Sequence, residues 1–192
     1  MTESEFLTVA VQGDEAVARA ALSANLALAS AMGADGTPVA LLTLYRGRKA
    51  LAEELGEAKR ETITIFEAAA LGRARDVAVL LHLHRDRARE VSPDGFTALH
   101  LAAFFGHHYC AKLLLEERAD PNVVSQNALK VTPLHSAIAD KEESVVEALV
   151  ATLLNAGANP NAAPNDGYTP LMGAQQRGLT RVERLLRAKG AR

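Results

Sequence analysis

The stretch TALHLAAFFGH, residues 97–107, decides the fold because related stretches recur at a nearly constant spacing along the chain. TPLHSAI stands at residues 132–138, and TPLMGA stands at residues 169–174. The opening threonines at 97, 132 and 169 are therefore 35 and 37 positions apart. A period of this length is typical of a repeat protein, in which each unit packs against its neighbours along one axis.

The segments that follow these openings recur as well. Each opening precedes a second apolar stretch and then a similar loop, which reads ADPN at 119–122, GANPN at 157–161 and GA at 190–191. Weaker openings lie upstream: ITIFEAAALG at 63–72, TPVALL at 37–42 and SEFLTVAVQGD at 4–14. Together these positions resemble the ankyrin repeat, whose signature is Thr-Pro-Leu-His-x-Ala with a period of about 33 residues.

The resemblance implies an all-α solenoid of stacked helix-turn-helix units joined by hairpin-like loops. We interpret residues 1–192 as a single ankyrin-repeat domain with repeats at approximately 4–36, 37–62, 63–96, 97–131, 132–168 and 169–192. The local chemistry agrees, because Thr is a favourable helix N-cap and Pro is favourable in the first helical position. Left-handed glycines are expected to end the first helices at Gly13, Gly72, Gly106 and Gly178.

Two departures from the repeat pattern predict local structure. Arg118 stands where the family usually has Gly, and a left-handed conformation there costs on the order of 1 kcal/mol. The fifth repeat is about four residues too long within 140–154, so either its second helix is longer or its inter-helix loop is larger. Leu149 and Leu153 are four positions apart and favour the longer helix.

The last repeat carries polar residues where other repeats have apolar ones. Gln175 replaces an apolar residue of the first helix, and Glu183 and Arg187 replace apolar residues of the second. A terminal repeat has no following neighbour, so its outer face must be polar. We therefore expect the solenoid to end near Arg192.

Composition and charge restrict the function classes. The net charge of −2 lacks the basic excess that nucleic-acid binding or an anionic membrane surface usually requires, so neither partner is expected. The charge-poor segment 20–45 is interrupted by Gly, Asp and Pro and does not predict a membrane span. Cys110 is the single cysteine, which excludes a disulfide within the chain and favours a cytoplasmic location.

Neither catalysis nor metal binding is expected. The chain has no glycine-rich phosphate loop, no Gly-x-Ser-x-Gly and no His-Glu-x-x-His. The resemblance gives His100 and His135 a structural role, with each side chain bonded to loop backbone. These two histidines also lie one repeat apart, which is too far to share a metal ion. We expect no catalytic residue, no cofactor site and no metal site.

The resemblance also implies where a partner would bind, since ankyrin proteins commonly use the concave face formed by first helices and loop tips. Five of the eight Phe and Tyr residues map to this face, and aromatic residues are favoured as interface anchors. Carried over position by position, the expected partner-binding residues are Leu44, Tyr45, Leu71, Phe96, Phe104, Phe105, Asp140, Tyr168 and Arg177.

The preferred hypothesis is a non-catalytic protein–protein interaction module that binds a partner protein on its concave face. One alternative is a homo-oligomeric structural or scaffold protein, for example a homodimer formed through the apolar strip. A less favoured alternative is a metal-dependent protein that uses histidines such as His82 or His107. Fold alone does not decide among these three.

Overall fold

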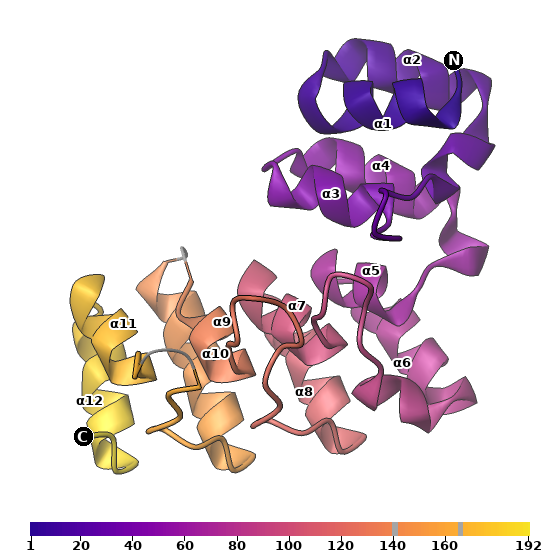
Figure 1. The fold of residues 1–192 in the computed structure, drawn as a ribbon. Coiled ribbons are helices and arrows are strands. Elements are labelled where there is room, and N and C mark those ends of the chain that lie inside the picture. The colour runs from indigo at the N-terminus through magenta and orange to yellow at the C-terminus, as the bar shows by residue number, and fades with distance from the viewer. Residues whose placement is uncertain (140–141, 165–166) are drawn as a thin grey trace.

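The computed structural model describes residues 1–139, 142–164 and 167–192. Within these residues twelve α-helices form six consecutive pairs, which stack along an elongated array (Figure 1). The pairs are α1 (Glu3–Gln12) with α2 (Glu15–Ala24), α3 (Val39–Tyr45) with α4 (Lys49–Ala58), α5 (Ile65–Ala70) with α6 (Ala74–Leu83), α7 (Ala98–Phe105) with α8 (His108–Glu116), α9 (Pro133–Ala137) with α10 (Glu143–Asn155), and α11 (Pro170–Gln176) with α12 (Thr180–Ala188). Short 3₁₀ segments follow α2, α4 and α6, namely η1 (Leu26–Ser30), η2 (Arg60–Thr62) and η3 (Arg85–Arg89).

The loops between pairs are hairpin-like but form no regular sheet. In the described part of the chain the extended pairing consists of isolated bridges, Met32 with Pro38 and Val91 with Thr97. The expected all-α solenoid with hairpin-like loops is therefore confirmed.

Reciprocal hydrogen bonds fix the start of α1, α5, α7 and α9. Thr97 Oγ1 accepts from the His100 backbone N–H at 3.4 Å, and the Thr97 N–H donates to His100 Nδ1 at 3.3 Å. In α5 the carboxylate of Glu67 replaces the imidazole and accepts from the Thr64 N–H at 3.0 Å. Each pair satisfies two backbone donors that a helix N-terminus leaves open.

The ends of the first helices match the glycine prediction with one exception. Gly72, Gly106 and Gly178 have φ between 65° and 87° and are left-handed as expected. Gly13 is extended, with φ −92° and ψ −156°, so the prediction was wrong there. Its extended backbone leads directly into Asp14, whose carboxylate caps α2 by accepting from the Ala16 N–H at 2.7 Å.

The second repeat starts one residue later than the sequence pattern suggested. Pro38, and not Thr37, occupies the N-cap of α3. The hairpin bonds show the same register, because Thr37 O accepts from Gly33 N–H at 2.8 Å where Phe96 O accepts from Ser92 N–H at 2.8 Å. Thr37 is thus the counterpart of Phe96, which precedes the cap.

The structure also shows where the extra residues of the fifth repeat lie and which backbone conformation Arg118 adopts. α10 has 13 residues, whereas α6 has 10 and α8 has 9, so the extra residues lengthen the second helix. Arg118 has φ +65° and adopts the expected left-handed conformation.

The stack changes direction between α4 and α5, so the first two helix pairs lie at an angle to the other four (Figure 1). The buried apolar residues accordingly form two clusters, one within residues 6–55 and one within residues 41–186. A buried ion pair lies at the change of direction, where Lys59 Nζ and Glu67 Oε1 are 3.0 Å apart. Both side chains are almost completely shielded from solvent.

Candidate partner-binding groove

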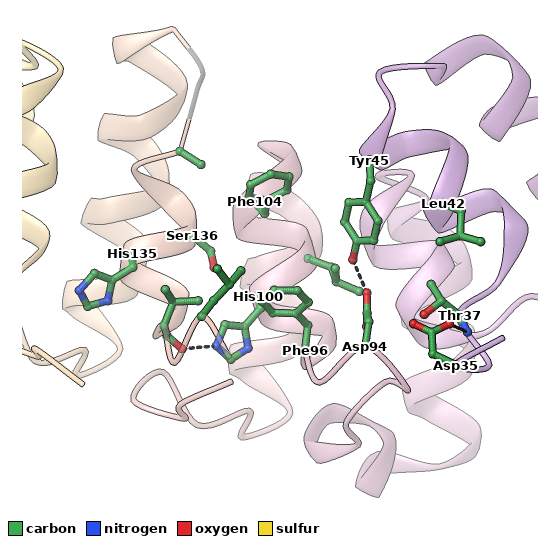
Figure 2. A pocket seen from close by; sticks show the side chains of 14 residues that line it. Asp35, Thr37, Leu42, Tyr45, Asp94, Phe96, His100, Phe104, His135 and Ser136 are labelled. Atoms are coloured by element: carbon green, nitrogen blue, oxygen red, sulfur yellow. Dashed lines mark hydrogen bonds between the residues drawn. The ribbon is translucent and has the colours of Figure 1, made fainter. Parts of the chain in front are cut away.

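An open hollow of about 520 Å³ runs along the face formed by α3, α7, α9 and the hairpin loops (Figure 2). We call it the aromatic groove because aromatic and aliphatic side chains make up much of its wall. Its lining residues are Asp35, Thr37, Leu42, Tyr45, Asp94, Phe96, His100, Leu101, Phe104, Leu129, Val131, His135, Ser136 and Ala139.

A row of aromatic rings connects α3 to α7 beside this groove. The Tyr45 ring stacks on Phe105 with centroids 5.8 Å apart, and Phe105 meets Phe104 edge-on at 5.0 Å. Tyr45 is 37 % exposed and Phe104 is 43 % exposed, whereas Phe105 is half-buried. Because these rings are already held by one another, they present apolar area to a partner and lose little conformational freedom on binding.

The Tyr45 hydroxyl also connects the second repeat to the hairpin loop that precedes α7. It donates a hydrogen bond of 2.5 Å to Asp94 Oδ2 (Figure 2). Burial of the hydroxyl, the bond to Asp94 and the negative charges of Asp94 and Asp35 all raise the pKa of Tyr45. The phenol is therefore protonated and acts as a donor at physiological pH.

The two histidines of the repeat signature are structural, as predicted. His100 is buried, and its Nε2 donates to the Val131 carbonyl at 3.0 Å while Nδ1 lies 2.8 Å from Thr97 Oγ1. His135 bonds in the same way to the Tyr168 carbonyl, at 3.1 Å. Burial lowers the pKa of His100 to about 4 and lowers the pKa of His135, so both imidazoles are neutral at pH 7.

The structure brings three of the expected partner-binding residues into the aromatic groove and buries one, Leu44, which lines only a smaller hollow. Tyr45, Phe96 and Phe104 line the groove. Leu44 is only 8 % exposed and belongs to the core, so its assignment to an exposed position was wrong. The later start of α3 is the reason, because counting from Pro38 makes Leu44 the counterpart of buried Ala103.

The other expected residues lie beside the groove. Phe105 and Leu71 are half-buried and line a smaller hollow of about 290 Å³ near the end of α3. Tyr168 and Arg177 line a third hollow, of about 180 Å³, next to α11. Asp140 lies outside the described residues.

Arg177 already has backbone partners. Its Nη1 donates to the carbonyls of Ile138 at 2.5 Å and Ala139 at 2.7 Å. These carbonyls follow the end of α9, where a cation is favourable to the helix dipole. The arrangement gives Arg177 a capping role between the fifth and sixth repeats.

Several groove residues were missed from the sequence. Asp35 could have been recognised, because Asp35-Gly36 forms the same turn as Asp94-Gly95, with both glycines at positive φ. Leu129 and Val131 come from an irregular loop, in which the left-handed residue Lys130 lies between them. A repeat pattern does not predict the path of such a loop.

Other reactive groups are occupied by structural contacts. His107 Nε2 bonds to the Ala70 carbonyl at 2.9 Å, and burial raises the pKa of Cys110 to about 11. In the part of the chain that the structure describes, no group of three or more His, Cys, Asp or Glu side chains has an arrangement suited to a metal ion. No helix among these residues is sufficiently long and apolar to cross a membrane.

Comparison with known proteins identifies the repeats independently. The family model for ankyrin repeats (3 copies) matches residues 7–125 and 65–162. The structure is similar to the crystal structure of an ankyrin repeat domain from Acinetobacter baumannii AYE. The alignment covers 100 % of both chains, with a TM-score of 0.62 and 28 % sequence identity.

Curated vertebrate proteins match part of this chain. The chain is 35 % identical over 133 residues to the nuclear factor NF-kappa-B p105 subunit of Gallus gallus. The aligned region covers 67 % of this chain and 13 % of that protein. It is 40 % identical over 92 residues to neurogenic locus notch homolog protein 1 of Danio rerio, and this aligned region covers 48 % of this chain and 3 % of that protein. The chain thus spans a small part of the length of these relatives.

Proposed function

The chain belongs to the ankyrin-repeat family, and from this we propose that it is a non-catalytic interaction module that holds a partner protein in the aromatic groove. Ankyrin repeats generally serve as protein–protein interaction modules. The proposal adds the face and the residues that make the contact.

The observation that carries the proposal is the open groove with Tyr45 and Phe104 exposed along it. Contiguous exposed apolar surface of this kind marks an interaction site more often than a tolerated exposure. Leu129, which is 57 % exposed, adds an aliphatic side chain to the lining. A partner side chain that enters the groove would be desolvated, which is the environment in which interface residues contribute most.

The proposal that the module is non-catalytic rests on the engagement of its reactive side chains. His100 and His135 are held between a helix cap and the next loop, and each is neutral at pH 7. Cys110 is buried with its thiol protonated, so it lacks the thiolate that a nucleophile requires. The same single buried thiol motivates our proposal that the protein acts in the cytoplasm as a scaffold.

The test compares two exposed aromatic residues on different faces. Phe104→Ser alters the groove, whereas Tyr109→Ser alters α8, where Tyr109 is 73 % exposed and outside the groove. Each tagged protein is expressed in its own cells, and the proteins that co-purify are quantified by mass spectrometry. We expect one or more partners to be lost with Phe104→Ser and retained with Tyr109→Ser. Equal recovery with both variants would contradict the proposed face.

A second copy of the chain is the alternative occupant of the same surface. Tyr168 extends the apolar strip towards α11, and its ring is exposed next to His135. Light scattering over a concentration series distinguishes the two cases. A dimer that dissociates with Phe104→Ser would favour the homo-oligomeric scaffold, and a monomer at all concentrations would exclude it.

A further inference from the structure

The charges around the aromatic groove indicate what kind of segment it takes. Asp35 and Asp94 occupy equivalent turns in the hairpins that precede α3 and α7, and both line the same end of the groove (Figure 2). No lysine or arginine is among the described residues that line it. The two imidazoles in the wall are neutral, so the described lining carries a net negative charge at physiological pH.

The two carboxylates are held in place but are not neutralised by a cation. Asp35 Oδ1 accepts from the Thr37 N–H at 2.9 Å, and Asp94 accepts from Tyr45 and from the Ser92 hydroxyl. Within the described chain neither carboxylate forms an ion pair with a basic side chain. Both are therefore fixed acceptors whose charge is available to a partner.

Apolar side chains dominate the remainder of the groove. Beyond the carboxylates the wall consists mainly of Leu42, Leu101, Phe104 and Val131, together with the ring of Phe96. Figure 2 shows the carboxylates on the side of α3 and the rings of Phe96 and Phe104 on the side of α7. The surface thus offers an anionic end next to an apolar trough.

We propose that the partner presents a short segment in which a lysine or arginine lies close to a large apolar side chain. The cation binds between Asp35 and Asp94, near the face of Tyr45, and the apolar side chain enters the trough beside Phe104. Opposite charges favour binding at the anionic end, and a cation is also attracted by an aromatic face. This inference rests on the proposed function and specifies the chemistry of the partner.

The test begins with selection from a displayed library of random short peptides against the full chain. We expect enriched peptides to share a basic residue at a fixed spacing from a large apolar residue. Binding of the best peptide, measured by fluorescence anisotropy, should weaken about tenfold in the Asp35→Asn, Asp94→Asn double variant, because two charge-assisted contacts are lost. It should also weaken as salt rises from about 0.05 to 0.5 M.

A matched control separates local charge from net charge. Asp86→Asn with Glu90→Gln removes the same charge from exposed positions outside the groove and should leave affinity unchanged. Phe104→Ser separates the two proposals. Peptides that require Phe104 but are acidic, uncharged or insensitive to the Asp35 and Asp94 changes would overturn the cationic segment alone. Peptides indifferent to Phe104, or a failure to enrich any, would overturn the groove as well.

Discussion

The buried imidazole of His100 gives the fold a pH dependence that can be calculated from the structure. In the folded chain burial lowers the pKa of His100 from 6.5 to about 4. A pKa lowered in this way means that the unfolded chain binds the proton more readily than the folded chain. The contribution of His100 to the free energy of unfolding is therefore fully present above pH 6.5 and is lost as the pH falls towards 4. At about 1.4 kcal/mol for each pKa unit, the full loss is on the order of 3 kcal/mol, of which about 2 kcal/mol has gone by pH 5.

His100→Ala isolates this contribution. At pH 7.5 the variant leaves the Thr97 N–H and the Val131 carbonyl without their partner, which costs roughly 3 kcal/mol because both are buried polar groups. At pH 5 the wild type has lost about 2 kcal/mol of its histidine contribution, and the variant has none to lose. The difference between the two proteins should therefore shrink by about 2 kcal/mol.

Urea unfolding followed by circular dichroism at pH 7.5 and 5.0 measures this difference. His84→Ala is the control, because His84 is exposed and lies beyond the end of α6. A gap between wild type and His100→Ala that is the same at both pH values would refute the reasoning, as would an equal response in His84→Ala.

Three further predictions concern stability. Leu99→Ala should lower the free energy of unfolding by about 3 kcal/mol in urea titrations, since Leu99 is fully buried, whereas Leu129→Ala at an exposed position should change it little. Arg118→Gly should raise the thermal midpoint, because glycine relieves a left-handed strain on the order of 1 kcal/mol; a lower midpoint would contradict this. Glu67→Gln keeps an acceptor for the cap of α5 but leaves Lys59 buried without its counter-ion, which should cost roughly 3 kcal/mol. Hydrogen exchange should then quicken in α4 and α5, and unchanged exchange in both helices would show that the ion pair does not hold this junction.

The features that the sequence predicted well are those set by local chemistry. Thr132-Pro133 and Thr169-Pro170 each place a cap and a first helical residue in fixed order, and both helices begin there. The left-handed residues Gly106 and Arg118 follow from the same positional logic. These signals act over a few residues, so they can be recognised in one chain.

The features that the sequence missed depend on contacts between repeats. Thr37-Pro38 matches the start of the repeat signature, yet the hairpin hydrogen bonds place Pro38 at the N-cap of α3. In this register Leu44 is buried. The Lys59–Glu67 pair was also missed, although Glu67 stands three residues after Thr64 in the spacing of a capping box. That spacing predicts the cap, but the partner of the second carboxylate oxygen, Lys59, comes from the preceding repeat and is not indicated by the repeat signature.

The aromatic groove was predicted only in part for the same reason. The pattern identified both Tyr45 and Phe104, but it aligned Tyr45 with Phe105, whereas the hairpin hydrogen bonds align Tyr45 with Phe104. Leu129 and Val131 reach the groove from a loop whose path depends on the left-handed backbone at Lys130. The change of direction between α4 and α5 likewise follows from packing between neighbouring pairs.

The most direct measurement of the central claim is site-specific photo-crosslinking in the protein's own cells. Benzoylphenylalanine is placed at position 104 in the aromatic groove in one strain and at position 109 on α8 in another. The account predicts a discrete crosslinked partner protein from position 104 and none of that species from position 109. The same partner captured equally from both positions, or only from position 109, would contradict it.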